Sequence, residues 1–87
     1  MPMKIEIKDS SQGPIYAQVR DQIQSLIRAG QLRGGEQLPA PAGLAADLNV
    51  DRGEITRAYY ELELAGLLVK ESGSDFLGKP RITYRVA

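Results

Sequence analysis

The chain has 87 residues, with 11 Lys plus Arg against 11 Asp plus Glu, so its formal net charge is zero, and it contains no Cys, His or Trp. A chain this short buries only about 60% of the surface that its unfolded form exposes, which favours one small domain spanning residues 1–87. Without Cys and His, disulfides, zinc and haem ligation and triad catalysis lose their usual groups, so we expect no enzyme activity, no cofactor and no metal.

No apolar run reaches the roughly 20 residues that span a bilayer, and the first residues lead into polar sequence rather than a signal-peptide core. We therefore expect a cytoplasmic protein with no membrane partner. The zero net charge argues against nucleic acid as a partner, because nucleic-acid binders usually carry a basic excess.

Residues 3–13 are predicted to form a short strand and a turn. Polar and apolar residues alternate from Met3 to Lys8, which places Ile5 and Ile7 on one face of a weak edge strand. A polar turn follows over residues 9–13.

Residues 14–66 are predicted to form three helices. Pro14 suits the start of the first helix and Gly30 suits its end. The apolar residues between them follow one helical stripe: Ile15, Val19, Ile23, Leu26 and Ile27. A second, short helix is predicted over Pro41–Leu48. Asp51 and Glu54 form a capping pair that would start a third helix, which ends at Gly66.

The remainder of the chain is predicted to form strands. Residues 67–78 are predicted as a hairpin, with strands at 67–69 and 76–77 around a turn at 72–75. Residues 79–87 are predicted as a separate C-terminal strand or tail, because Ile82, Tyr84 and Val86 alternate with polar residues. The element order predicts an α+β fold, a winged helix-turn-helix with three helices and a small antiparallel sheet.

The middle of the chain meets the packing needs of a helix-turn-helix. Two helices that cross steeply over a short turn need a small residue at their closest approach, a turn residue that tolerates positive φ, and an apolar anchor in the second helix. Ala45, Asn49 and Ile55 fill these three roles in order.

Several separated motifs then point to a family. They are Pro14–Val19, Ile27–Leu32, Gly35–Pro39, Leu44-Ala45, Leu48–Val50, Arg57–Tyr59 and Leu62–Leu68. In this order and spacing, over residues 14–77, the chain resembles the amino-terminal domain of GntR-family transcription regulators. The resemblance implies a homodimer that binds double-stranded DNA, with the third helix in the major groove and the hairpin tip, called the wing, at the minor groove.

The resemblance also implies which residues contact DNA. They are Arg52, Gly53, Glu54, Thr56 and Arg57 in the third helix, and Gly73 and Ser74 in the wing, where Gly73 matches the first wing-tip glycine. The larger regulators of this family carry an effector domain after the wing. Only about ten residues follow it here, so we expect no small-molecule effector, and a dimer would use the first helix, an edge strand or residues 81–86.

The departures from the family pattern lie at positions that bind DNA. Where the family has a Ser cap, an Arg and a Glu at the second helix, this chain has Ala40, Ala42 and Gly43. In the wing, the usual arginine and second glycine are Ser74 and Asp75. The segment 39–57 carries Arg52 and Arg57 against Asp47, Asp51 and Glu54, a net of 2 − 3 = −1. We therefore expect weakened DNA contacts.

Other interpretations of the same residues remain open. Arg52 and Arg57 are alternatively solvated helix charges, with Arg57 pairing with Glu61. Glu54 is better explained as a cap than as a base contact. Tyr16 and Tyr59 are predicted as core residues with solvated hydroxyls, whereas Tyr60 lies off the apolar stripe and is free to face a partner.

The charges of the last segment are also open to two interpretations. Lys70, Lys79, Arg81 and Arg85 against Glu71 and Asp75 give 4 − 2 = +2, a solvated strand face or a surface for a DNA backbone or an acidic partner. The competing function is a winged-helix protein-interaction module that has lost operator binding and acts by pairing with or antagonising another protein.

Overall fold

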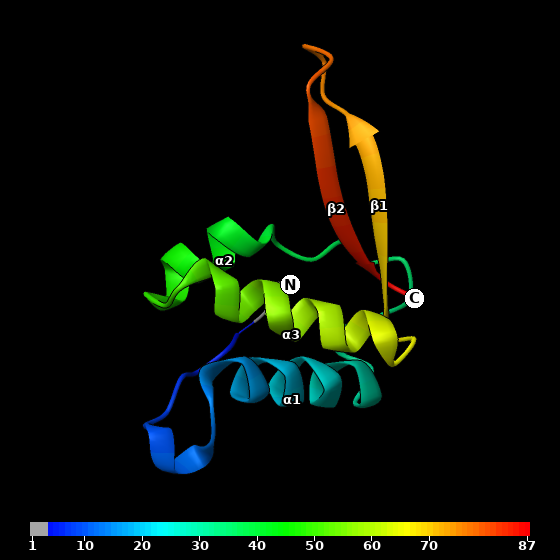
Figure 1. Cartoon of the computed structure of the whole chain (residues 1–87). Helices are drawn as coiled ribbons and strands as arrows, with labels where there is room; N and C mark the ends of the chain where they lie inside the picture. The colour runs from blue at the N-terminus through cyan, green and yellow to red at the C-terminus, as the bar shows by residue number, and fades with distance from the viewer. Residues whose placement is uncertain (1–3) are drawn as a thin grey trace.

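The computed structural model describes residues 4–87, in which three helices are followed by a long antiparallel hairpin (Figure 1). The elements are a 3₁₀ turn η1 (Ser10–Gln12), α1 (Ile15–Arg28), α2 (Pro41–Leu48), α3 (Arg52–Leu64), β1 (Leu68–Ser74) and β2 (Pro80–Val86). The hairpin of β1 and β2 is the wing, and it projects away from the helices. This arrangement confirms the predicted winged-helix fold.

The three helices surround an apolar core to which the base of the wing also contributes. Val19 and Ile23 of α1 meet Ile55, Tyr59 and Leu62 of α3, and these five side chains are fully buried. The other three residues of the predicted α1 stripe, Ile15, Leu26 and Ile27, pack against the core at its margin. The bounds of α1 and α2 agree with those predicted because their apolar spacing is local and regular.

The turn between α2 and α3 has the predicted geometry. Asn49 adopts the left-handed conformation with φ 57° and ψ 47°, which ends α2, and the Val50 N–H donates to the Ala45 carbonyl at 3.0 Å. Ala45 and Ile55 are both buried where the two helices cross. The helix-turn-helix assignment therefore rests on observed backbone geometry.

The predicted N-terminal strand is wrong over the described residues, and Met3 lies outside them. Residues 4–9 are irregular, because side chains of α1 rather than a neighbouring strand satisfy their backbone groups. Gln18 Oε1 accepts from the Lys8 N–H at 2.7 Å, and Gln18 Nε2 donates to the Gly13 carbonyl at 2.9 Å. Gln22 Oε1 accepts from the Glu6 N–H at 3.0 Å. Ile5 is nonetheless buried in the core.

The predicted pairing of the hairpin is also wrong. β1 pairs antiparallel with β2 from Leu68↔Val86 to Ser74↔Pro80, so residues 80–86, expected as a separate tail, form the return strand. Phe76 and Leu77, expected in that strand, lie at the tip instead. The observed register buries Tyr84 and Val86 against the helices, which favours it over a shorter hairpin that would leave both exposed.

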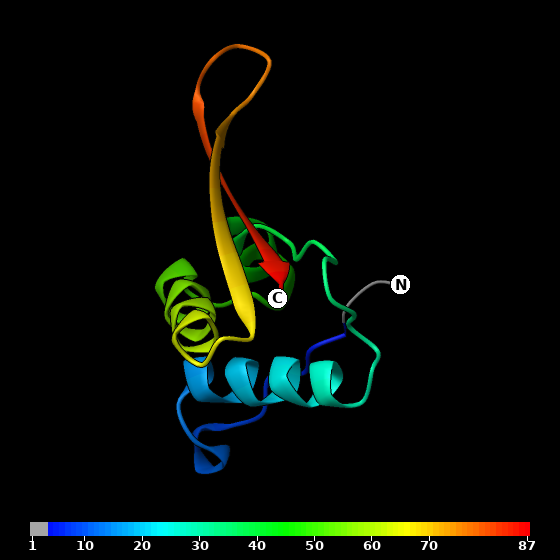
Figure 2. The same ribbon diagram turned by 90° about the vertical axis from the view of Figure 1, so that its right-hand side faces the viewer.

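Contacts at its base fix the orientation of the wing. The Leu38 N–H donates to the Tyr84 carbonyl at 2.8 Å, and the Val86 N–H donates to the Glu36 carbonyl at 2.9 Å, so the connector before α2 lines one edge of β2. The Tyr84 ring meets the Tyr59 ring edge to face, with centroids 4.9 Å apart. Figure 2 shows the wing rising from this base.

Tyr59 differs from its prediction at one atom. Its ring is in the core as expected, but its hydroxyl is not solvated, because it donates to the Pro39 carbonyl at 2.9 Å. Burial, with a smaller effect from Tyr84, raises the pKa of Tyr59.

Within residues 4–87, no helix is long and apolar enough to cross a lipid bilayer.

Candidate nucleic-acid interface

The start of α2, the first half of α3 and one face of the wing border a common cleft of about 290 Å³. Its lining residues are Ala40, Pro41, Ala42, Arg52, Thr56, Lys70, Ile82 and Tyr84. The cleft brings together residues from three elements that are up to 44 positions apart in sequence, from Ala40 to Tyr84. The exposed start of α3 and the wing thus form one continuous surface.

Two cations and a hydroxyl line this cleft. Arg52 and Thr56 lie one turn apart on the exposed side of α3, and the Thr56 hydroxyl donates to the Arg52 carbonyl at 3.1 Å. Lys70, also exposed, approaches from β1. Two of the predicted DNA-binding residues, Arg52 and Thr56, therefore lie together. The sequence placed Lys70 in the basic final segment but did not predict that it lies beside Arg52 and Thr56.

The α2 side of the cleft has small, uncharged residues. Ala40 occupies the N-cap of α2 and gives no side-chain cap, while Pro41 occupies the first helical position. Ala42 is exposed at the cleft, and a Cβ added to Gly43 would meet nothing within 4 Å. Because Ala42 is exposed and lines the cleft, a longer side chain at this position would extend into the cleft.

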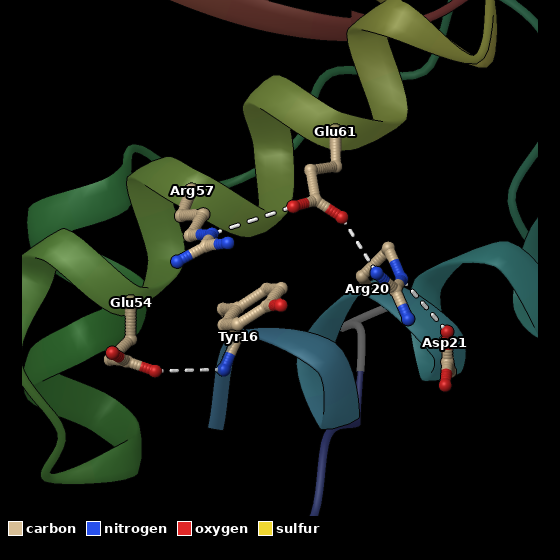
Figure 3. A network of polar contacts seen from close by, with 6 residues as sticks. All are labelled: Tyr16, Arg20, Asp21, Glu54, Arg57 and Glu61. Carbon is tan, nitrogen blue, oxygen red and sulfur yellow. Dashed lines mark hydrogen bonds and ion pairs between the residues drawn. The ribbon is translucent and has the colours of Figure 1, made fainter. Parts of the chain in front are cut away.

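Arg57 points to α1 rather than into the cleft (Figure 3). Its Cζ lies 3.9 Å from the centroid of the Tyr16 ring, a cation–π contact, and its Nε lies 3.4 Å from Glu61 Oε2. The predicted Arg57–Glu61 pair is confirmed. Tyr16 is half-buried beneath the Arg57 guanidinium, and the role of Arg57 in DNA binding remains a prediction.

Glu61 joins α3 to α1 through a second arginine. Arg20 Nη1 donates to Glu61 Oε1 at 2.6 Å, and Arg20 Nε donates to Asp21 Oδ1 at 3.0 Å (Figure 3). The hydrogen bond from Arg20, with a smaller one from Arg57, lowers the pKa of Glu61. The bonds to Asp21 and then Glu61 raise the pKa of Arg20. Glu61 and Arg20 are therefore both charged at neutral pH.

The predicted capping pair at the start of α3 is wrong. Asp51 occupies the N-cap position but makes no side-chain cap bond, and the Glu54 carboxylate turns to another helix. Glu54 Oε2 accepts from the Tyr16 N–H at 2.8 Å, at the second residue of α1 (Figure 3). Pro14, the N-cap of α1, offers no side-chain acceptor, so Glu54 supplies one and places a negative charge where the helix dipole favours it.

The remaining predicted residues lie in two places. Gly53 is exposed on α3, and a Cβ there would lie 3.3 Å from Asp51 Oδ2. Gly73 and Ser74 lie in β1, paired with Arg81 and Pro80, and not at the tip as expected. The tip glycine with positive φ is Gly78, at φ 79°.

The wing carries the positive charge of the final segment, for which the sequence allowed two interpretations. Arg85 Nη2 pairs with Glu71 Oε2 at 2.9 Å near the middle of the hairpin. Lys79 and Arg81 are exposed close to the tip. The net charge of +2 in the final segment was the sequence signal for this surface, but only the strand pairing placed it on the wing.

The comparison with known proteins agrees with this geometry. Residues 15–77 match the family described as "Bacterial regulatory proteins, gntR family". HTH-type transcriptional regulator Rv1152 of Mycobacterium tuberculosis is 35% identical over 66 residues, which are 76% of this chain and 53% of that protein. The HTH-type transcriptional repressor YtrA of Bacillus subtilis is 33% identical over 64 residues, which are 74% of this chain and 49% of that protein. The chain thus spans about half the length of these relatives.

Solved structures show the same fold. YtrA from Sulfolobus acidocaldarius, a GntR-family transcription factor, superposes with a TM-score of 0.75 at 31% identity, covering 99% of this chain and 80% of that one. AraR(DBD) in complex with operator ORX1 superposes with a TM-score of 0.70 at 26% identity, covering 100% and 99%. These relatives are transcription regulators rather than enzymes. The chain belongs to the gntR family of bacterial regulatory proteins and is a DNA-binding transcriptional regulator domain of the winged helix-turn-helix type.

Proposed function

We propose that this domain binds duplex DNA in the cytoplasm through the cleft between α2, α3 and the wing, with Arg52 and Thr56 as the principal α3 contacts. The observation that carries the proposal is the position of Arg52, Thr56 and Lys70 around one cleft. An exposed helix start fits the major groove, which is about 12 Å wide, while cations beside it neutralise phosphates. Because Gly53 has no side chain, the backbone of α3 can approach DNA closely at this position.

We propose further that this binding is weaker than the fold alone would suggest. Ala42 gives no cation to the cleft, and Arg57 is already engaged with Tyr16 and Glu61. Each phosphate contact that is absent makes the salt dependence of binding shallower by about 0.9 logarithmic units. Modest affinity with a shallow salt slope is the expected behaviour.

A homodimer is the proposed binding form, because two copies would double the few cations that each domain offers. Tyr60 and Leu64 support it, since both are exposed and lie one turn apart on α3. The proposal is tested by sedimentation of the protein with and without a DNA duplex.

Fluorescence anisotropy with a pool of random 24-base-pair duplexes at about 50 mM salt tests DNA binding. We expect salt-sensitive binding at micromolar protein, weakened several-fold by Arg52→Ala and by Lys70→Ala. Arg28→Ala removes an equal charge at the far end of α1 and should change little. The absence of salt-sensitive binding by the wild type would overturn the proposal.

The competing function is that of a protein-interaction module which pairs with or antagonises another protein. Ala42 and the Glu61-bound Arg57 favour it, since both reduce the charge available to DNA. It predicts that Arg52→Ala leaves regulation intact while Tyr60→Ala abolishes it. The reverse result would exclude this alternative.

A further inference from the structure

The tip of the wing presents two large apolar side chains to solvent. Phe76 is 95% exposed and Leu77 is 66% exposed. Both lie in the turn between β1 and β2, which is the tip of the projecting hairpin (Figure 1). Neither contributes to the hydrophobic core. Exposed aromatic residues at a projecting tip contribute nothing to folding and are available to a partner.

The tip is ordered despite its exposure. Asp75 Oδ1 accepts hydrogen bonds from the Leu77 N–H at 2.9 Å and from the Lys79 N–H at 3.0 Å. The Asp75 N–H donates to the Lys79 carbonyl at 3.0 Å, and the Gly78 N–H donates to the Asp75 carbonyl at 2.9 Å. These bonds occupy Asp75 Oδ1 and fix the backbone of the turn that carries Phe76 and Leu77, which reduces the entropy lost on binding.

The wing is long enough to reach a second groove. Each strand has seven residues, which at about 3.3 Å per residue gives a hairpin roughly 23 Å long. The wing borders the same cleft as the start of α3. With α3 in a major groove, the adjacent minor groove lies about half a helical turn away, roughly 17 Å. The tip therefore extends as far as that groove.

Charge near the tip favours DNA as the occupant. Lys79 follows the apolar pair after Gly78, and Arg81 lies two residues further along. Both are exposed, so they can meet phosphates on either side of a groove while the apolar pair is central. Phe and Leu are among the side chains that wedge between base steps from the minor groove.

We infer that Phe76 and Leu77 form a wedge that inserts between base pairs in the minor groove and kinks the duplex. The inference rests on the DNA-binding function proposed above and adds to it a sequence preference. Pyrimidine–purine steps such as TA unstack most easily, whereas A-tracts are stiff. The wing would thus favour a TA step without any hydrogen bond to a base.

The first test uses tryptophan fluorescence. Because the chain has no Trp, Phe76→Trp creates a single reporter at the tip. Titration with a 24-base-pair duplex containing central TA steps should quench it strongly, since the indole stacks on bases. Gln31→Trp places the same reporter in the exposed loop after α1, away from the proposed interface, and should be quenched little. Equal quenching of the two, or none of Phe76→Trp when anisotropy shows binding, would overturn the wedge.

The second test compares affinities for the TA-step duplex and an A-tract duplex of equal length. We expect the wild type to prefer the TA-step duplex by about fivefold, because unstacking it costs less. Phe76→Ala should lose this preference with an unchanged salt slope. Lys79→Ala should keep the preference and make the slope shallower by about one unit.

The outcomes separate the wedge from the proposed function. Wild-type protein that binds neither duplex at low salt contradicts both. Wild-type binding that Phe76→Ala leaves unchanged, preference included, contradicts the wedge alone. Phe76-dependent binding to phosphatidylcholine–phosphatidylglycerol vesicles, with no quenching on DNA, would also overturn it in favour of a lipid surface.

Discussion

The exposed side chains of α3 have two different neighbours. Arg52 and Thr56 border the cleft, whereas Glu54 and Arg57 contact α1. Successive residues of a helix point about 100° apart, so a helix of this length can serve two surfaces at once. Of the two arginines of α3, only Arg52 therefore borders the proposed DNA interface.

Restoring a cation to the cleft should strengthen DNA binding. Ala42→Arg places a guanidinium in the cleft that Arg52 and Lys70 also line. We expect several-fold tighter binding to the random duplex pool and a salt slope about one unit steeper. Gln31→Arg adds the same charge in the exposed loop after α1 and is the control. Equal gains from both variants would show that only net charge matters.

Removing the Glu54 carboxylate should destabilise the domain. Glu54→Ala leaves the Tyr16 N–H at the start of α1 without its acceptor, at a cost of about 1–2 kcal/mol in the free energy of unfolding. Glu54→Gln keeps an acceptor but loses the charge, so it should cost less. Urea denaturation measures both. Equal stability of Glu54→Ala and wild type would contradict the capping role.

Residue-level prediction from sequence succeeded where the partners are local. Asn49 and the Arg57–Glu61 pair were both expected, because the turn and the one-turn spacing are visible within a few residues. The partner of Glu54 was not predictable in this way. Tyr16 lies 38 residues away in sequence, and only the packing of α1 beside α3 brings the two together.

α1 serves as the platform for the N-terminal segment as well as for α3. The side-chain amides of Gln18 and Gln22 hydrogen-bond to backbone groups of residues 4–13. Two other residues of α1, Tyr16 and Arg20, contact α3. Gln18 is the buried polar side chain of this region, and its amide is satisfied at both ends. A buried amide of this kind stabilises only if all its partners remain.

Replacing Gln18 should detach the N-terminal segment. Gln18→Ala removes the bonds to Lys8 and Gly13, and we expect a loss of about 2 kcal/mol in stability. Backbone amides of residues 4–9 should exchange with solvent much faster than in wild type, measured by hydrogen exchange. Gln24→Ala, a half-exposed residue on the same helix, is the control. Unchanged exchange in Gln18→Ala would contradict this anchoring.

The contact between α1 and α3 should weaken in acid. The folded pKa of Glu61 is lowered, so its contribution to stability is complete above the unfolded pKa of about 4.3 and is lost as pH falls through the folded pKa. Melting temperatures measured from pH 7 to pH 3 should fall less steeply for Glu61→Gln than for wild type. Parallel pH profiles would contradict a stabilising role for Glu61.

At the level of elements, the sequence was sufficient for helices and insufficient for strand pairing. Each helix was predicted from a stripe of apolar residues and from the residues at its ends. Gly30 and Gly66 have the positive φ that is typical of a residue just after a helix, which agrees with the predicted ends. The hairpin has several possible registers, and local turn residues near Gly73 favoured the wrong one. The long-range burial of Tyr84 and Val86 selects the observed register.

The whole molecule separates its charges by region. The overall balance of 11 against 11 conceals acidic residues that are engaged in internal contacts and a basic surface on the wing. Glu54, Glu61 and Asp75 all accept bonds from within the domain. A zero net charge is thus compatible with DNA binding.

This distribution predicts the salt dependence of DNA binding. The cations of the proposed interface are Arg52 and Lys70, which line the cleft, and Lys79 and Arg81, which are exposed near the wing tip. Neutralising one phosphate with each gives a slope of about −3 to −4 in a plot of log K against log salt for one domain, and about twice that for a dimer. Anisotropy titrations between about 50 and 200 mM salt measure the slope. A slope near zero would contradict the assigned surface.

The capping bond from Glu54 to α1 limits how the specificity of this domain can be redesigned. A library that randomises α3 at Gly53 and Thr56 changes exposed residues whose loss costs the fold little. The same library at Glu54 or Arg57 also weakens the contact with α1, so its members would lose stability at the same time as they change the α3 surface. New operator preferences should therefore be selected at Gly53 and Thr56 first.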